Sequence, residues 1–527
     1  MTIKILLVIL FFGVMLGVGL YSRRHALSVA GFVLGGRNVG PWLTAFAYGT
    51  SYFSAVVFVG YAGQFGWKYG LASTWIGIGN ALIGSLLAWV LLGRRTRIMT
   101  NHLSAATMPD FFGKRYQSHS LKIVASAIIF VFMIPYTASV YNGLSRLFGM
   151  AFDIPYTACV IAMAVLTGAY VILGGYMATA INDFIQGIIM LFGIVAVITA
   201  VLNGQGGFYT AVQKLAEFPS ETAPTLGQAG AYTSFFGPDP VNLLGVIILT
   251  SLGTWGLPQM VHKFYTIKSE KTINTGTIVS TAFAFVVAGG SYYLGGFGRL
   301  FDSPAVRAQD GAVIYDGVIP NMLSTLPDIL LGIVVVLVLS ASMSTLSSLV
   351  LTSSSTLTLD FLKGTFMKNM DEKRQMLIMR LLIVFFIGIS VALALNPPTF
   401  IAQLMGISWG AMAGSFLAPF LYGLYWRRVS KAAVWASFFT GVALTVGNIF
   451  FKFIQSPINA GALAMILGLI VVPLVTLITK PVDKEYTEGL FSSYEEVVMV
   501  PQKSSLTFKN KKWQDFAGET AKKNIYS

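Results

Sequence analysis

Residues 339–356 read LSASMSTLSSLVLTSSST, a run of serine and threonine inside a segment otherwise hydrophobic enough to cross a membrane. On a helix, residues three and four positions apart share one face. The residues at that spacing are Ala341, Ser344, Ser347 and Ser348, and Thr345 stands about 100° away from them. Hydroxyls facing lipid would serve no purpose, but hydroxyls facing a cavity supply the neutral oxygen ligands that a small hard cation needs. The stretch therefore predicts a cation site inside a membrane protein.

The composition supports a membrane location for the whole chain. Of the 527 residues, 55% are hydrophobic and 11% are charged, and the mean hydropathy is +0.72. Soluble domains carry roughly 25% charged residues, so these values are typical of a protein with many membrane spans. The single cysteine, Cys159, excludes a disulfide framework.

Apolar windows of about 20 residues predict an all-α protein with about thirteen transmembrane helices. The first window is followed by basic residues and has no small-residue cleavage site before Ser22, so we expect an uncleaved span and not a signal peptide. Residues 1–479 form the expected transporter domain, and 480–527 form a polar cytoplasmic tail. The expected spans are 3–21, 41–64, 69–92, 122–148, 155–174, 179–202, 239–262, 274–298, 328–360, 377–395, 399–425, 432–454 and 460–479.

The net charge of +14 reflects membrane topology. With these spans, 28 of the 35 lysine and arginine residues lie in the loops and the tail on one side, and Lys263 is counted among them. The positive-inside rule then places the N-terminus outside and the C-terminus in the cytoplasm of a multi-pass cell-membrane protein. The basic residues therefore do not indicate a nucleic-acid surface. The outer loops 203–238 and 300–327 are expected to hold turns or short helices.

Asp183 is the one carboxylate expected inside the membrane, in the segment GGYMATAINDFIQG. Buried charges are costly in a membrane and usually functional, so a cation ligand near Asn182 and Gln186 is one interpretation. The alternative is that Asp183 caps the sixth span at its N-terminus, where the helix dipole favours an anion.

Two other segments read as broken helices. FAYGTSYFS, residues 46–54, interrupts the second span, and SLGTWGLPQ, residues 251–259, interrupts the seventh. Unwound backbone at mid-membrane frees carbonyl groups for ions and directs half-helix ends at a substrate. Because the two breaks lie five helices apart, they indicate an inverted repeat, which is typical of secondary transporters.

The chain resembles the sodium/solute symporter family, and especially its bacterial sodium/proline branch. The resemblance is carried by FVLGGRNVGPWLTAFAYGTSYFSA, TMPDFFGKRY, GGYMATAINDFIQ, LSASMSTLSS and ISWGAMAGSFLAPFLYGLYWRR, spread over residues 32–428. It implies a LeuT-type core of two inverted five-helix repeats, 41–202 and 239–425. One extra helix precedes this core and two follow it. It also implies a monomeric transporter, without catalytic activity, that uses Na+ and a small organic solute.

The resemblance further implies two sets of sodium ligands. The main ion would take carbonyl oxygens from Thr50, Phe53 and Ala341 and the hydroxyls of Ser344 and Thr345. A possible second sodium would use Asp183, Ser344, Ser347 and Ser348. The chain departs from the proline branch at Tyr52, where that branch has an acidic residue, so the solute pocket is where the resemblance is weakest.

For the solute, we expect a polar and aromatic pocket made by Tyr52, Tyr136, Ser139, Trp255 and Gln259. Such a lining suits a compact organic molecule. The alternative for Tyr136 and Trp255 is that they only pack core helices or anchor an interface. We expect Arg146 and His262 to be interfacial residues.

An amino acid such as proline is the first candidate for the solute, and a sugar, sialic acid or a monocarboxylate is the alternative. A membrane sensor without transport is the candidate from another class, although such proteins usually carry an added signalling domain. A channel would show a repeated filter sequence. Coupling to protons stays open, because Asp183 could titrate.

Overall fold

The computed structural model describes residues 2–152 and 154–495. Ten of its helices are long and apolar enough to cross a membrane, and the bent pair α11–α12 makes an eleventh. Two of the ten, Val56–His102 and Tyr156–Gly204, are 47 and 49 residues long. Since about 20 residues cross a bilayer, Tyr156–Gly204 holds two spans, and Val56–His102 holds the second part of the span that begins with α3 and one further span. Counted in this way, the described residues contain the thirteen expected spans.

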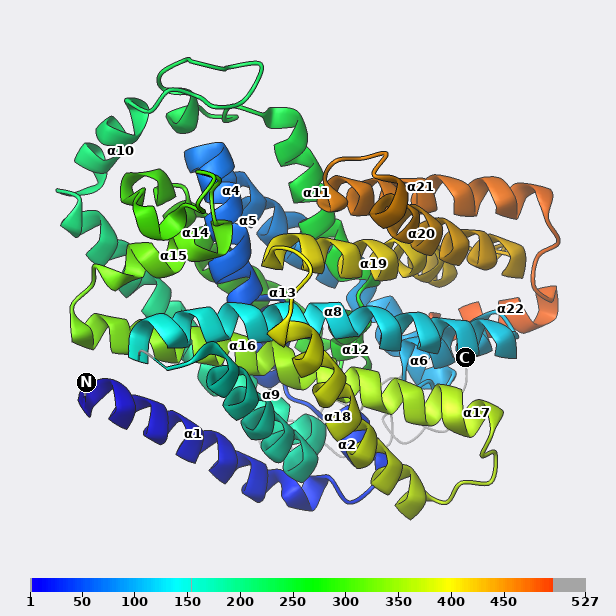
Figure 1. Ribbon diagram of the computed structural model, residues 1–527. Helices are drawn as coiled ribbons and strands as arrows, with labels where there is room; N and C mark the ends of the chain where they lie inside the picture. The colour runs from blue at the N-terminus through cyan, green and yellow to red at the C-terminus, as the bar shows by residue number, and fades with distance from the viewer. Residues whose placement is uncertain (1, 153, 496–527) are drawn as a thin grey trace, which may run out of the picture.

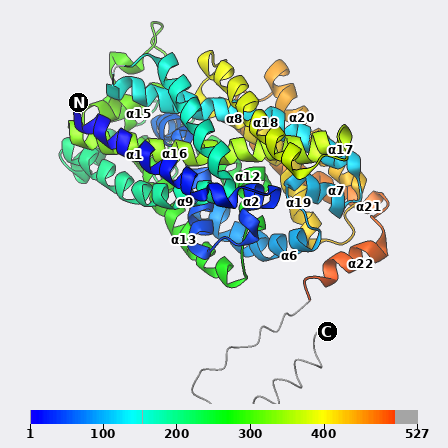
Figure 2. The ribbon, with the colours of Figure 1, turned by 90° about the horizontal axis from the view of Figure 1, so that it is seen from below.

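Several long helices, among them α8, α16 and α19, run roughly parallel to one another, and α9 and α18 cross them at an angle (Figure 1). Helix α16 (Asp328–Thr356) lies in the middle, packed between α8 (His119–Phe152) and α9 (Tyr156–Gly204). Helix α1 (Thr2–Ser22) lies along α9 at the edge of the bundle (Figure 2). The last two spans, α20 and α21, pack against α19 at the opposite side.

The other helices, including those named above without bounds, are the following: α2 Val29–Leu34, α3 Pro41–Tyr52, α4 Ala62–Tyr69, α5 Thr74–Gly79, α6 Arg94–His102, α7 Met108–Arg115, α10 Phe208–Ala216, α11 Pro240–Gly256, α12 Pro258–Tyr265, α13 Lys271–Ala284, α14 Gly290–Gly295, α15 Tyr315–Ser324, α17 Lys363–Thr365, α18 Glu372–Leu395, α19 Ile401–Tyr425, α20 Lys431–Phe451, α21 Pro457–Ile478 and α22 Lys484–Ser492.

The first expected break separates α3 from the rest of its span. Helix α3 ends at Tyr52, Phe53 has the extended dihedral angles φ −85° and ψ 124°, and helical turns resume at Val56. These turns, Val56–Tyr61, are wide π-helical turns, which are common at functional sites. The backbone carbonyls just before the break therefore lack their usual partners one turn further along the helix.

The second break has nearly the same geometry. Helix α11 ends at Gly256, Leu257 has φ −81° and ψ 122°, and α12 starts at Pro258 with a bend of 43°. Proline has no backbone N–H and fits the first turn of a helix, which explains why α12 begins there. Equivalent dihedral angles at Phe53 and Leu257 fit the inverted repeat expected from the sequence.

The fifth and sixth spans are joined without a loop. Within α9, Gly175 alone has non-helical angles, with φ 54° and ψ −150°. A side chain at this position would be strained by the backbone and would lie 2.7 Å from the ring of Phe32. The glycine therefore permits a sharp change of direction between two spans.

The two long loops 203–238 and 300–327 contain short helices, as expected from the sequence. Helix α10 lies in the first loop and α15 in the second, both at the same end of the bundle (Figure 1). Helices α6 and α22 pack together at the opposite end. The last two thirds of the predicted tail, residues 496–527, lie outside the described residues.

Candidate functional site: an ion-binding face on α16 and an aromatic cluster

The hydroxyl-rich part of α16 lies in the interior of the protein. Every residue from 337 to 356 is buried, although the segment carries many serine and threonine side chains. Buried hydroxyls need hydrogen-bond partners, so their contacts show which parts of the protein this helix packs against. Two neighbouring sets of contacts are present, and they differ in charge.

The first set joins α16 to the break after α3. The Ser344 hydroxyl donates to the Thr50 carbonyl at 2.9 Å and lies 3.0 Å from the carbonyl of Ala341 in its own helix. The Thr345 hydroxyl lies 3.2 Å from the Phe53 carbonyl, 3.2 Å from that of Ala341 and 3.5 Å from that of Thr50. All five residues predicted for the main sodium ion are therefore brought together.

This cluster contains neutral oxygen atoms only. A cation entering it would replace the hydroxyl hydrogen bonds, since a serine or threonine hydroxyl can turn its lone pairs toward an ion. Among the described residues, no group of three or more histidine, cysteine, aspartate or glutamate side chains could hold a metal ion. The chemistry of the cluster therefore suits a weakly bound, hard monovalent cation.

The second set surrounds Asp183. Its side chain is fully buried, and its carboxylate lies 3.7 Å from the ammonium group of Lys263, which is itself 2% exposed. The same ammonium donates to the Ser348 hydroxyl at 3.0 Å and lies 5.1 Å from the centre of the Tyr176 ring. A positively charged side chain is therefore placed between the aspartate and the serine predicted to share a second sodium.

Three expectations about this region are wrong. Lys263 is not a loop residue, because α12 is a short half-helix that keeps its fifth and sixth residues inside the bundle. His262 is buried against Tyr176, with ring centroids 5.5 Å apart, and is not interfacial. Asp183 is not an N-terminal cap, because it follows the break at Gly175 by eight residues and lies within the helix.

The remaining polar residues near Asp183 contact either their own helix or α1. Ser347 donates to the Ser344 carbonyl of its own helix at 2.9 Å. Asn182 and Gln186 place their amide nitrogens near the carbonyl oxygen and the sulfur of Met15 in α1, at 3.5 and 3.1 Å. A second sodium at this position stays a prediction.

The two sets are connected through one pair of hydroxyls. Ser348 lies 2.9 Å from the hydroxyl of Ser51, which is in the last turn of α3. The carbonyl of Ser51 is in turn 3.3 Å from the Thr345 hydroxyl. A change at the Lys263 ammonium can thus reach the neutral cluster through three hydrogen bonds, from Lys263 to Ser348, from Ser348 to Ser51 and from Ser51 to Thr345.

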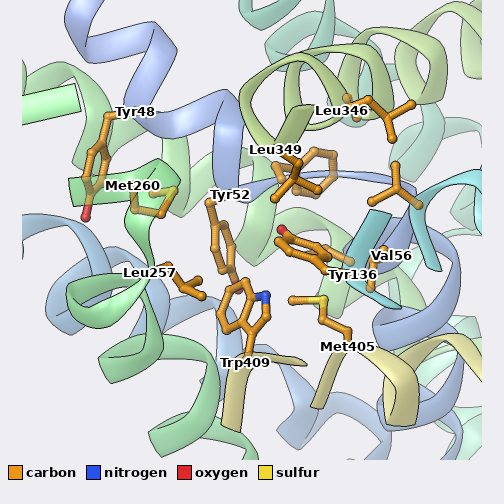
Figure 3. Close-up of a cluster of buried hydrophobic side chains, with 14 of the residues drawn as sticks. Tyr48, Tyr52, Val56, Tyr136, Leu257, Met260, Leu346, Leu349, Met405 and Trp409 are labelled. Atoms are coloured by element: carbon orange, nitrogen blue, oxygen red, sulfur yellow. The ribbon is translucent and has the colours of Figure 1, made fainter. Parts of the chain in front are cut away.

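An aromatic cluster lies beside the first break (Figure 3). The ring of Trp409 in α19 lies 5.7 Å from that of Tyr52 and 5.8 Å from that of Tyr136. The Trp409 indole nitrogen and the Tyr136 hydroxyl are buried without a hydrogen-bond partner. Such unsatisfied polar groups in a central aromatic cluster are what a polar solute would engage. Trp409 was missed because nothing in its local sequence, which includes the adjacent Ser408, indicates that it packs against Tyr52 and Tyr136.

The other residues predicted for the solute pocket differ in whether their polar groups already have hydrogen-bond partners. Gln259 is buried, and both atoms of its amide lack a partner. Ser139 donates to the Tyr136 carbonyl of its own helix at 2.6 Å. Trp255 donates its indole N–H to the Ile83 carbonyl at 2.9 Å. Tyr52 hydrogen-bonds to Asn80 and borders a cavity of about 10 Å³, room for roughly one water molecule.

Asp183 is not the only buried carboxylate. Asp360 is buried after α16, 3.2 Å from Lys122. Asp316, in the loop helix α15, is buried 4.0 Å from Arg146, and this burial raises the pKa of its carboxyl to about 6. Arg146 is therefore not a simple interfacial anchor. It lines, with Asp316, a cavity of about 680 Å³ at the end of the bundle that carries the long loops.

The first broken helix meets a buried cluster of neutral oxygens, and the second has the same backbone geometry at its break. Together with an aromatic cluster whose polar groups are unused, they define a secondary transporter. The chain belongs to the sodium:solute symporter family, whose model matches residues 32–441. The resemblance seen in the sequence is thereby confirmed.

Curated relatives match almost the full length. The chain is 28% identical to the osmoregulated proline transporter OpuE of Bacillus subtilis, over 94% of this chain and 99% of that protein. It is 30% identical to a sodium/proline symporter of Staphylococcus aureus, over 91% of this chain and 93% of that protein. A solved sodium-coupled sialic acid symporter has the same fold, with a TM-score of 0.75 at 15% identity, over 92% of this chain and 98% of that one. The fold is therefore of the expected LeuT type.

Proposed function

We propose that this protein is a sodium-coupled symporter that imports a small amino acid, with proline as the first candidate. The family membership and the names of the two bacterial relatives support this assignment. At about 30% identity the solute can differ between relatives. The assignment of the solute therefore rests on the lining of the pocket as well as on the names of the relatives.

The observation that carries the proposal is the meeting of α16 with the first break. Hydroxyls of Ser344 and Thr345 lie within 3.5 Å of carbonyls that the break frees at Thr50 and Phe53. With the Ala341 carbonyl, they offer five oxygen ligands of the type that a sodium ion takes in such sites. An ion bound here would hold α3 and α16 together.

The link that a bound ion would make between α3 and α16 explains how sodium would drive transport. A sodium ion moving inward gains roughly 2.3 kcal/mol per 100 mV of membrane potential, in addition to its concentration gradient. An ion that binds better when the break and α16 are aligned shifts the protein toward that state. If the solute also binds best to that state, the two bind cooperatively and cross together.

The solute would lie against Tyr52, Tyr136 and Trp409. The unsatisfied Tyr136 hydroxyl, Trp409 indole N–H and Gln259 amide are available to a carboxylate or an amino group. The aromatic faces would cover a compact apolar ring or chain. This combination of polar groups and aromatic faces suits a small amino acid such as proline, and the cavity of about 10 Å³ beside Tyr52 would have to widen to admit it.

The first experiment is a thermal-shift screen of the purified protein with solutes, in sodium and in choline. A transported solute should raise the unfolding temperature only when sodium is present, because a ligand stabilises by mass action through its own binding equilibrium. Proline, other amino acids, sugars, sialic acid and monocarboxylates form the panel.

The second experiment is uptake into proteoliposomes at fixed pH, with sodium replaced by lithium or choline. Uptake that needs sodium and persists without a pH gradient supports sodium coupling. Equal uptake in sodium and choline would overturn the proposal, and uptake that follows the pH gradient alone would indicate protons as the coupling ion.

A further inference from the structure

We infer that the Lys263 ammonium acts as a tethered cation in the place of a second sodium ion, so that the transporter uses one sodium per cycle. The inference rests on the proposed sodium symport and adds its stoichiometry. It also assigns a role to Lys263, which the proposed transport mechanism leaves without one.

The position of the ammonium group is the first argument. It lies 3.0 Å from the Ser348 hydroxyl and 3.7 Å from the Asp183 carboxylate, two of the groups expected to bind a second sodium. The Tyr176 ring lies 5.1 Å away and offers its negative face to the cation. These three contacts come from α9 and α16, so the lysine of α12 joins the two helices that a sodium ion would join.

Charge balance is the second argument. Asp183 is fully buried with neither carboxylate oxygen hydrogen-bonded, and the Lys263 ammonium, 3.7 Å away, is its ion-pair partner. A buried carboxylate needs one positive charge nearby, and removing that charge is strongly unfavourable. A sodium ion added beside the ammonium would place two positive charges around one carboxylate in a poorly hydrated interior, where like charges repel strongly. Ammonium and a second sodium therefore exclude each other.

The connection to the main cluster is the third argument. Ser348 accepts from the ammonium and lies 2.9 Å from the Ser51 hydroxyl, next to the Thr50 carbonyl that would bind the transported ion. A bound second sodium would order this part of the break each time it entered. The tethered ammonium supplies the same order without being exchanged, so only one ion has to come from solution.

The test uses sodium alone and needs no knowledge of the solute. Binding of ²²Na⁺ to the purified, full-length protein is counted for the wild type, Lys263→Met and the double variant Lys263→Met/Asp183→Asn. We expect one sodium per wild-type protein. Lys263→Met keeps the carboxylate but loses the ammonium and should bind two. The double variant has neither charge and should return to one. The exposed loop residue Lys268 provides a matched control, Lys268→Met, which should bind one.

Thermal unfolding provides an independent readout in the same samples. Lys263→Met should unfold at a lower temperature than the wild type in choline and recover most of the loss in sodium, because sodium replaces the missing ammonium. Asp183→Asn leaves an ammonium without its partner and should be destabilised equally in sodium and choline. A purely structural salt bridge would give no such sodium-dependent difference between the two variants.

The outcomes separate this inference from the proposed function. Two sodium ions on the wild type, or one on a folded Lys263→Met protein with no rescue by sodium, would overturn the inference and leave sodium symport intact. If Lys263→Met cannot be purified, Lys263→Gln, which also removes the ammonium and keeps the carboxylate, is counted in its place and should bind two; one sodium on that variant would overturn the inference. No sodium bound to any variant would overturn the proposed function itself.

Discussion

The two sets of contacts on α16 lie one helical turn apart and differ in the charge of their partners. Around Ser344 and Thr345 the partners are backbone carbonyls and hydroxyls without net charge. Around Ser348 the partner is a buried ion pair, Asp183 with Lys263. A neutral cluster can release its cation at every cycle, whereas a tethered ammonium stays. The comparison shows how one helix face can contain both an exchangeable and a fixed positive charge.

The largest predicted effect is the loss of stability when one charge of the Asp183–Lys263 ion pair is removed. Asp183→Asn should lose about 3 kcal/mol of stability or more, because the ammonium is left buried without its partner. The double variant Lys263→Met/Asp183→Asn should regain most of this loss, since no buried charge remains. Thermal unfolding in choline measures both. A double variant as unstable as the single one would show that packing at these positions, and not charge, sets the stability.

Substitutions in the neutral cluster around Ser344 and Thr345 should instead lower the affinity for sodium. Thr345→Ala removes one ligand of the transported ion, and losing a hydrogen-bonding group to a charge costs about 1.5–3 kcal/mol. We expect the sodium concentration for half-maximal uptake to rise roughly ten- to hundredfold. Thr345→Ser keeps the hydroxyl and is the matched control, with a sodium requirement near that of the wild type.

An unchanged sodium requirement in both Ser344→Ala and Thr345→Ala would contradict the assignment of the main site. Because these side chains also hydrogen-bond across the break, the amount of folded protein in the membrane is measured beside uptake. A loss of folded protein without a change in the sodium requirement would mean that the hydroxyls only hold the helices together.

The hydroxyl bridge between the two sets should show a smaller effect. Ser348→Ala removes the link from Lys263 to Ser51, and one neutral hydrogen bond contributes about 1 kcal/mol. We expect the sodium requirement of uptake to rise about fivefold. Ser347→Ala is the matched control, because its hydroxyl donates within α16, and its sodium requirement should change by less than about twofold. Equal effects of both variants would argue against the bridge.

The aromatic cluster should affect the solute more than the ion. Trp409→Phe keeps the ring but removes the buried indole N–H, which has no partner in the described structure. The solute concentration for half-maximal uptake should rise about threefold to fivefold, since one hydrogen bond to the solute is lost. The sodium requirement, measured at saturating solute, should stay the same. A selective change in the sodium requirement would place Trp409 in the ion path instead.

Much of this arrangement could be predicted from local sequence. The three- and four-residue spacing of Ala341, Ser344 and Ser348 defined the helix face, and the glycine and hydroxyl residues before Phe53 marked the break that this face meets. Both signals are local, so a single sequence contains them. The pairing of the main ligands followed from family resemblance, and the structure brings the same five residues together.

Lys263 could not be recognised in the same way. It precedes Lys268 and Lys271 in the chain and reads as the start of a cytoplasmic basic cluster. Its burial follows from the break at Leu257, which makes α12 a short half-helix inside the bundle. Trp409 was missed for a related reason, because only packing of α19 against α8 brings it to Tyr136. Both residues depend on contacts between distant parts of the chain.

The ratio of charge to solute carried per cycle tests the account most directly. In proteoliposomes at a fixed membrane potential, the sodium-dependent current and the uptake of radiolabelled solute are measured together, using the neutral solute that the thermal-shift screen selects. With one exchangeable sodium and a fixed ammonium, the wild type should move one elementary charge per solute molecule. A ratio of two would mean that a second sodium crosses as well, and would contradict the role assigned to Lys263.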